Sequence, residues 1–286
     1  MIVGLLGDVH ANGEFLNFAL WKMNLENISD VIQVGDFGIG QTNYNARFLR
    51  RASVLAAHFG ITVHIVPGNH EDHVLINELI GEQRTDFVRL RDNLLLVPRG
   101  MRWQWGSSTF VGLGGAPSVD MTARKAAQMG ILDRKKHSWF PEEMITEEDL
   151  AYVAEGGYAD IMLCHDAPNG VSAITKRISS NPMGFDVAGL AYAEEGREKM
   201  TRAFRSVAPK TFVHGHYHFP VNEMVPRPGM GSGSEMEYTH ILGLGCDGSY
   251  MQFSMGHYDT ETKIAHMWNS HEDHMNYNRE SRSFVK

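Results

Sequence analysis

The segment IVGLLGDVH, residues 2–10, starts as an apolar run and ends in a glycine followed by polar side chains. The segments DVIQVGD (30–36) and ITVHIVPGN (61–69) repeat this order. Short runs rich in valine and isoleucine are typical of buried strands. Between them, residues 14–25 and 43–59 carry apolar side chains at helical spacing. Strands that alternate with helices of this length predict parallel βαβ units.

The alternation continues through the rest of the chain. We expect a helix from about Glu71, a helix that follows a cap at Thr146, and a long helix over residues 186–207. Strands are expected at residues 94–97, 108–115, 159–165 and 210–216, a β-hairpin at 219–226 and 235–245, and two closing strands at 250–253 and 257–268.

Residues 1–268 are predicted to form a single domain, because no linker or break in composition divides them. The periodic pattern weakens between residues 117 and 148, which predicts an insertion over the functional site. Residues 269–286 are polar, and we expect them to form a C-terminal tail that is frayed or bound to a partner.

The composition argues against a membrane or a nucleic-acid polymer as partner. No apolar run approaches the roughly 20 residues of a membrane span, and the N-terminus lacks the basic region of a signal peptide. We therefore expect a cytoplasmic protein. A net charge of −8 opposes the broad basic surface that binds nucleic acid. Cys164 and Cys246 lie in strand-like segments and are expected to be buried free thiols. The oligomeric state is left open.

Several other side chains allow two interpretations. The basic residues Arg124, Lys125, Arg134, Lys135 and Lys136 form either a solvated helix face or a rim that faces phosphate. The aromatic residues Trp103, Trp105, Trp139 and Phe140 either pack in the core or stack on nucleobases. The imidazoles of His58, His64, His73 and His214 are expected to be structural.

Five short motifs supply polar donors directly after strand-like runs: GDVH, GDFG, GNHE, CHDAP and GHYH. Because each motif follows a strand, all of them can meet at the ends of one sheet. Carboxylates, imidazoles and an amide oxygen together suit ions such as Mn, Fe and Zn. The sequence therefore predicts a site for two metal ions. The candidate ligands are Asp8, His10, Asp36, Asn69, His165, His216 and His218.

The spacing within the motifs suggests how the ligands are arranged. Asp36 is the expected bridge, because one carboxylate can bind two cations that lie about 3.5–4 Å apart. Asp8 and His10 stand two residues apart, so an extended strand end would send both side chains the same way. A turn in GHYH would splay His216 and His218 toward different ions.

Three further residues in the motifs have other expected roles. Asn69 offers an oxygen without adding charge, which leaves the site positive toward phosphate. His70 points elsewhere and is available for proton transfer. Asn12 either braces the ligands of the first ion or caps the helix that follows it.

The five motifs, in this order, resemble those of the calcineurin-like metallophosphoesterases over residues 8–218. The chain most resembles the small bacterial and phage-type phosphodiesterases of this superfamily. The resemblance implies a four-layer α/β/β/α sandwich of two mixed β-sheets, the metallo-dependent phosphatase fold. It also implies that Asp8, His10, Asp36 and His218 hold one ion and that Asp36, Asn69, His165 and His216 hold the other.

The chemistry implied by the resemblance is attack of a metal-bridging hydroxide on phosphorus. Mn is the expected metal, with Fe or Zn as alternatives, and His70 would stabilise the transition state or protonate the leaving oxygen. Protein phosphatases of the superfamily continue GDxVDRG, in which an aspartate orients the catalytic histidine and an arginine grips phosphate. Here Phe37, Gly38, Ile39 and Gly40 follow Asp36, so both helpers are missing from the motif. What orients His70 is left open.

We therefore expect a metal-dependent hydrolase of small phosphodiesters, a class that includes cyclic nucleotides. A phosphodiester carries one negative charge and needs less cationic grip than a monoester. The alternatives are a nuclease, a phosphomonoesterase or a protein phosphatase of the same superfamily, and a catalytically inactive binding scaffold.

Overall fold

The computed structural model describes residues 1–130, 139–229 and 237–268. The predicted C-terminal tail, most of the loop between the hairpin strands, and Arg134, Lys135 and Lys136 lie outside these ranges. Within the described ranges no helix is both long enough and apolar enough to cross a membrane.

The first sheet contains seven strands in the order β13-β12-β1-β2-β3-β5-β4. Its parallel centre is formed by β1 (Ile2–Leu6), β2 (Asp30–Gln33), β3 (Thr62–Ile65) and β5 (Leu94–Leu96). The antiparallel strands are β4 (Val88–Arg91) at one edge and β12 (Met255–Asp259) and β13 (Ile264–Met267) at the other. The predicted parallel βαβ units thus form the middle of a mixed sheet.

The second sheet contains six strands in the order β10-β11-β9-β8-β7-β6. Its parallel strands are β7 (Ser108–Leu113), β8 (Ile161–Cys164), β9 (Thr211–His214) and β11 (Tyr238–Gly243). Antiparallel edge strands are β6 (Arg102–Trp105), which pairs with β7, and β10 (Val221–Pro226), which forms the predicted hairpin with β11.

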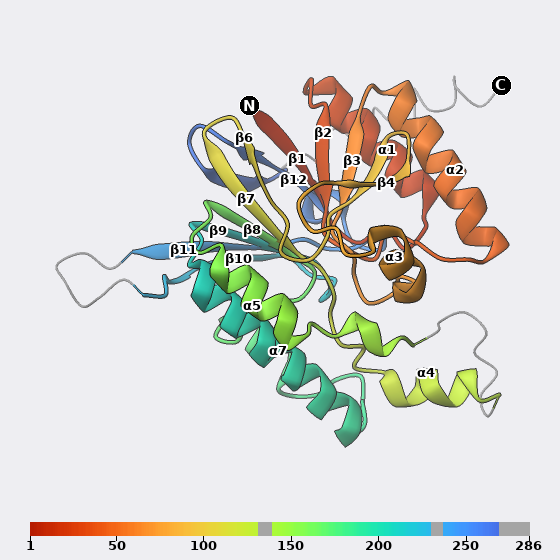
Figure 1. Cartoon of the computed structure of the whole chain (residues 1–286), viewed down its shortest axis with the longest axis vertical. Helices are drawn as coiled ribbons and strands as arrows, with labels where there is room; N and C mark the ends of the chain where they lie inside the picture. Colours follow the sequence, from red (N-terminus) through yellow and green to blue (C-terminus); the bar gives the residue numbers. More distant parts are fainter. Residues whose placement is uncertain (131–138, 230–236, 269–286) are drawn as a thin grey trace.

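Helices cover the outer face of each sheet (Figure 1). The helices α1 (Gly13–Leu25), α2 (Asn43–His58) and α3 (His73–Ile80) lie beside the first sheet. The helices α5 (Glu147–Glu155) and α7 (Val187–Val207) lie beside the second. The remaining helices are α4 (Met121–Gln128), α6 (Ser172–Ile178) and two 3-10 turns, η1 (Pro141–Glu143) and η2 (Met251–Phe253). The architecture is the expected α/β sandwich of two mixed sheets.

The apolar runs are continuous because their strands are buried on both faces. In β1, Val3 and Leu5 pack between the two sheets, whereas Leu6 packs toward α1. Phe110 of β7 lies in the same intersheet core. Trp103 packs against Phe110 with the ring centroids 5.3 Å apart, and Trp105 lies at the same distance. These contacts support core packing over base stacking for the two tryptophans.

Most expected helices occur as predicted, including α5 with Thr146 as its cap. The GNHE helix, however, starts at His73 rather than at Glu71, because Asp72 caps it by accepting from the backbone N–H of Leu75. The strand predicted over residues 250–253 was wrong, since this segment is η2. The chain turns there so that Ser254 can accept from Gly7 beside β1. Both closing strands instead lie within 255–267.

The segment predicted as an insertion contains α4 and η1 in its described part. The turn η1 packs against α3, and α4 packs against α7. Thr122 of α4 donates to Asp186, the cap of α7, at 3.2 Å. The segment therefore links the helices of the two halves. Whether it is an insertion relative to other members of its fold stays a prediction.

Candidate metal centre

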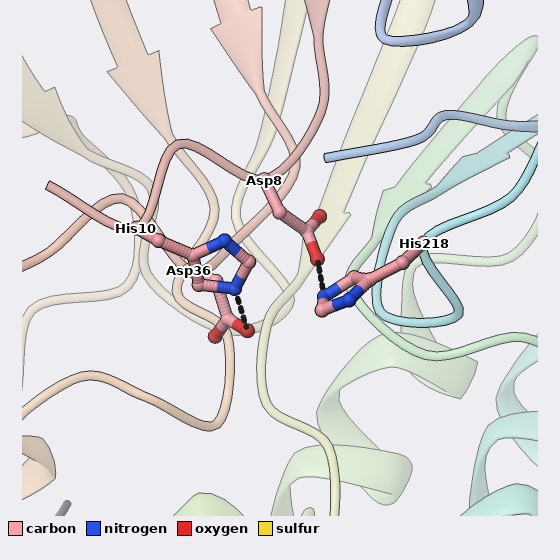
Figure 2. A group of neighbouring side chains, drawn as sticks. All are labelled: Asp8, His10, Asp36 and His218. Atoms are coloured by element: carbon pink, nitrogen blue, oxygen red, sulfur yellow. Dashed lines mark ion pairs between the residues drawn. The ribbon is translucent and has the colours of Figure 1, made fainter. Parts of the chain in front are cut away.

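The first donor group consists of Asp8, His10, Asp36 and His218, which converge from three different motifs. Figure 2 shows their side chains pointing toward one another. One ligand atom from each residue lies within 4.8 Å of the others. Nε2 of His218 is 3.0 Å from an oxygen of Asp8, and Nε2 of His10 is 3.5 Å from Oδ2 of Asp36. Two carboxylates and two imidazoles at this spacing can hold a divalent ion.

The second donor group consists of Asp36, Asn69, His165 and His216. The amide oxygen of Asn69 lies 3.0 Å from Nε2 of His165 and 3.1 Å from Nδ1 of His216. Nε2 of His165 is also 3.4 Å from Oδ1 of Asp36. The structure thus brings together all seven predicted ligands. It also separates His216 from His218, as the expected turn in GHYH required.

The backbone at the centre differs from the extended geometry expected for DxH. His10, Asp36, His216 and His218 have φ angles of 46°, 56°, 68° and 59°, in the left-handed region. The explanation from an extended strand end was therefore wrong for Asp8 and His10, although their side chains do converge. Left-handed backbone is uncommon for residues other than glycine and clusters at functional sites. Tight turns, and not strand alternation, aim these ligands.

Glycines in the motifs allow the backbone to pass close to the carboxylates. A Cβ atom added to Gly68 would lie 2.3 Å from Oδ1 of Asp36. A Cβ atom added to Gly215 would lie 2.1 Å from Oδ1 of Asp8. Both distances are far inside van der Waals contact, so any side chain at either position would displace a candidate ligand.

Asp247 supports the first donor group and was not among the site residues predicted from the sequence. Its carboxylate accepts from Nδ1 of His10 and from the amide of Asn12, both at 2.9 Å. The bond to Nδ1 leaves Nε2 of His10 facing Asp36. Asn12 also accepts from the N–H groups of Glu14 and Phe15. Asn12 therefore fulfils both of its expected roles, since it caps α1 and braces the partner of His10.

Buried hydrogen bonds support the second donor group. Nδ1 of His165 bonds to the carbonyl of Val34 at 2.7 Å, which leaves Nε2 for the centre. The amide nitrogen of Asn69 donates to Ser118 at 3.0 Å, and this turns its oxygen toward His165 and His216. Ser118 in turn donates to the buried carboxylate of Glu143 at 2.8 Å. Ser118 and Glu143 carry no motif that could have identified them.

Glu71 joins two of the motif loops. Its buried carboxylate accepts from the N–H groups of Asp36, Gly38 and Gly68 at 3.1, 3.0 and 2.5 Å. Burial and the nearby charge of Asp36 raise the pKa of Glu71 to about 7. The last residue of GNHE is thus a brace for the loop that carries Asp36, and its position in the motif was the available signal.

His70 is oriented by a residue from the 117–148 segment. The guanidinium of Arg124 lies 2.9 Å from Nε2 of His70, and its Nε donates to Asp120 at 2.7 Å. The backbone N–H of His70 donates to Asp36 at 2.8 Å. Arg124 therefore stands beside His70, and Asp120 stands beside Arg124, although GDFG itself lacks an arginine and a second aspartate. Both residues come from a segment distant from GDFG, so the motif alone does not identify them.

The carboxylates give the centre a negative potential that suits cations. Burial lowers the pKa of His10, but hydrogen bonds to Asp247 and Asp36 outweigh it and raise that pKa to about 11. The same balance of burial against a bond to Asp8 raises the pKa of His218 to about 10. Burial raises the pKa of Asp36, yet the charges of His165 and His70 hold it well below its usual range.

The histidines expected to be structural lie outside the two donor groups. His73 bonds to the carbonyl of Gly68 at 2.7 Å, and burial lowers its pKa to about 3. Burial likewise lowers the pKa of His214 to about 4. Lys125 lies over the ring of Trp139 at 3.9 Å, so this basic residue packs on an aromatic side chain. Cys164 and Cys246 are buried free thiols, as predicted.

Solved structures share this fold. A dimetal phosphatase from Danio rerio is 12% identical, with a TM-score of 0.52 over 90% of this chain and 91% of that one. The protein TT1561 from Thermus thermophilus is 13% identical, with a TM-score of 0.52 over 94% of this chain and 99% of that one. No curated protein sequence matches the chain significantly.

The family profile described as calcineurin-like phosphoesterase matches residues 1–220, which is more than half of the chain. The matched region includes all five motifs and therefore both donor groups. The chain belongs to the calcineurin-like phosphoesterases, and it is a metal-dependent hydrolase.

Proposed function

We propose that the protein uses two divalent ions to hydrolyse small phosphodiesters, with cyclic nucleotides among the candidate substrates. The observation that carries this proposal is the position of Asp36 between the donor groups. Its Oδ2 faces His10 of the first donor group at 3.5 Å, and its Oδ1 faces His165 of the second at 3.4 Å. One carboxylate that presents one oxygen to each group is the arrangement of a bridging ligand.

The donor chemistry fits two borderline divalent ions. Asp8, His10 and His218 would hold one ion together with Asp36, whereas Asn69, His165 and His216 would hold the other with the same carboxylate. Mixed oxygen and nitrogen donors favour Mn, Fe or Zn over Mg or Ca. When bound, such a pair supplies an activated water nucleophile and neutralises charge on the phosphoryl oxygens.

The protein's own residues would do the rest of the chemistry. His70 lies at the edge of the first donor group, with its ring centroid 5.6 Å from that of His10. From there its imidazole can donate a proton to the oxygen that leaves phosphorus. Glu71, Asp247 and Ser118 would hold the ligand side chains in place, which keeps the donor positions fixed during the reaction.

A diester substrate is supported by the loop after Asp36. Ile39 and Gly40 occupy the positions at which protein phosphatases carry their polar helpers, and Ile39 is buried with Phe37 in the core beside α1. This loop therefore adds no cation to the site. The formal charge of −8 favours a small substrate over a nucleic-acid polymer. A cytoplasmic location fits such a substrate and stays a prediction.

A monoesterase is the second candidate, and one contact favours it. Arg124 lies beside His70 and adds a positive charge at the centre. A monoester carries up to two negative charges and benefits more from an additional cation. The nuclease and the inactive scaffold have no comparable contact in their favour.

The test compares an aryl phosphodiester with the matching aryl monoester. Protein stripped of metal is reloaded with Mn, Fe or Zn in separate samples, and turnover is measured with both esters. Metal-dependent turnover with the diester preferred supports the proposal. A preference for the monoester moves the assignment to a phosphomonoesterase. Absence of turnover with every metal, while each sample binds two ions, would contradict hydrolysis of small esters.

A further inference from the structure

We propose that Arg124 binds a phosphoryl oxygen of the substrate and thereby supplies the phosphate grip that the GDFG motif lacks. This inference deepens the proposed function and rests on it for the identity of the ligand as a phosphate ester. Arg124 comes from α4, more than 80 residues after Asp36 in the sequence.

The first argument is the state of the guanidinium. Arg124 is only 5% exposed, and its Nε and Nη2 are engaged by Asp120 and His70. Its Nη1 is buried and has no hydrogen-bond partner among the described residues. An unpaired donor on a buried charged group costs free energy, so such a group normally has a hydrogen-bond partner, and a bound phosphoryl oxygen would supply one here. The open nitrogen belongs to a residue that already contacts the catalytic candidate.

The second argument is position. Nε2 of His70 lies 3.8 Å from Oδ2 of Asp36, the carboxylate shared by both donor groups. A phosphoryl group held at the centre would therefore lie beside His70 and within reach of the same arginine. Guanidinium N–H groups match phosphate oxygens in geometry as well as charge. Arg124 can keep Nη2 on His70 while Nη1 takes an oxygen, which would fix the imidazole against the substrate.

The third argument is how firmly α4 is placed. Asp120 accepts from Arg124 at 2.7 Å within one helical turn and holds the plane of the guanidinium. Thr122 ties α4 to Asp186, and Ser118 just before the helix bonds to Asn69. Residues 69 and 70 are thus both held by the short stretch 118–124. The segment that orients a candidate ligand also delivers the arginine.

Binding of inorganic phosphate to the metal-loaded protein tests the inference without relying on turnover. Calorimetry compares the wild type with Arg124→Ala, Arg124→Lys and Lys125→Ala, and the metal content of each sample is measured by mass spectrometry. We expect phosphate to bind Arg124→Ala at least about tenfold more weakly, because a charge-assisted hydrogen bond is lost. Arg124→Lys keeps the positive charge but loses the planar set of guanidinium donors, so its affinity for phosphate should lie between those of the wild type and Arg124→Ala.

Lys125→Ala is the matched control, since it removes an equal charge from the same helix without touching His70. It should bind phosphate as the wild type does. The inference is overturned if Arg124→Ala and Arg124→Lys hold two metals and bind phosphate with wild-type affinity, or if the metal-loaded wild type binds no phosphate. Where Arg124→Ala does not fold, Arg124→Lys decides.

The outcome separates this inference from the proposed function. A wild type that binds phosphate through Arg124 but turns over neither aryl ester would contradict the proposed activity and leave the arginine's role intact. If the wild type hydrolyses esters and Arg124→Ala has the same kcat/KM, the proposed activity stands and the role of the arginine is contradicted. In an active enzyme we expect Arg124→Ala to lower kcat/KM by at least about tenfold.

Discussion

The two donor groups share Asp36 but differ in their exposure to solvent. In the second group His165 is 0% exposed, whereas the side chain of His218 in the first group is 44% exposed. The second group is held by interior hydrogen bonds to Val34 and Ser118. The first depends on Asp247, a partly exposed carboxylate from the last third of the chain. One group is therefore built into the core, and the other is completed at the surface.

This difference in exposure indicates which donor group substrate and solvent reach first. His70 lies against His10 on the more exposed side, where His218 also lies, and Arg124 contacts His70. Substrate and solvent would reach the first donor group, while the second would retain its ion because water has little access to it. We therefore expect the two ions to exchange at different rates, the ion of the first donor group faster.

Removing Asp36, which both donor groups share, should impair both groups alike and have the largest effect on metal content and turnover. Asp36→Ala takes one ligand from both groups, so we expect metal content to fall and turnover to drop by about 10³-fold or more. Metal analysis and ester hydrolysis measure the two effects. Asp30→Ala removes a carboxylate from the opposite end of β2 and should keep both metals. Full metal content in Asp36→Ala would contradict the bridge.

Removing His70 should affect the chemistry while leaving both groups intact. We expect His70→Ala to retain two ions and to lose turnover by about 10²- to 10⁴-fold, the usual range for a general acid. The loss should be larger for an ester with a poor leaving group, because such an oxygen needs the proton more. Equal losses for good and poor leaving groups would show that His70 does not protonate the leaving oxygen.

The buried support of the second group should give the protein a pH-dependent stability. Burial raises the pKa of Glu143 to about 7, above its ordinary value of 4.5. The folded state then holds this proton more tightly than the unfolded chain does. The resulting stability is present below pH 4.5 and is lost as pH rises toward 7.

Relative to Glu143→Gln, the free energy of unfolding of the wild type should therefore fall by up to about 3 kcal/mol across that window. Denaturant titrations at several pH values measure the change. Glu142→Gln is the matched control, since it makes the same change at the neighbouring glutamate, which is exposed. A constant difference between wild type and Glu143→Gln would contradict the raised pKa.

The smallest effects should distinguish the two supports. Asp247→Ala should weaken metal binding at the first donor group by about tenfold and leave the second unchanged, because an outer partner orients each ligand. Ser118→Ala should do the converse through Asn69. Two-site titration with Mn, followed by magnetic resonance of the paired and single ions, measures both constants. Equal weakening of both sites by either variant would contradict separate supports.

The sequence predicted which side chains the structure brings together, because most of these residues obey a local rule. A glycine and a polar residue directly after an apolar run identify a strand end, and parallel strands bring such ends together. Asp36 and Asn69 could be found in this way, whereas His165 follows its apolar run without a glycine. The two mixed sheets were implied by the family resemblance, whereas the pattern itself predicted only the parallel βαβ units.

The supporting residues could not be predicted, because their roles depend on how distant segments pack. Glu143 lies where the periodic pattern weakens, so nothing local marks it. Arg124 stood out only as part of a basic cluster, and the sequence left open whether that cluster is a solvated helix face or a rim that faces phosphate. Asp247 follows a strand and glycine-rich turn, yet its role requires β12 to return beside β1. The geometry of DxH failed for a related reason, since His10 adopts a left-handed turn that no spacing rule reports.

The left-handed turns at the centre position the candidate ligands but lower the stability of the folded protein. Ala11 and four candidate ligands sit in this conformation, and each non-glycine residue there costs about 1 kcal/mol. Replacing any one of these ligands by glycine would relax the backbone and remove a donor in the same step. Selection for thermal stability alone would therefore favour substitutions that remove candidate metal ligands. A stabilising programme should begin at Ala11→Gly, the one position of the five where relaxation takes no donor away.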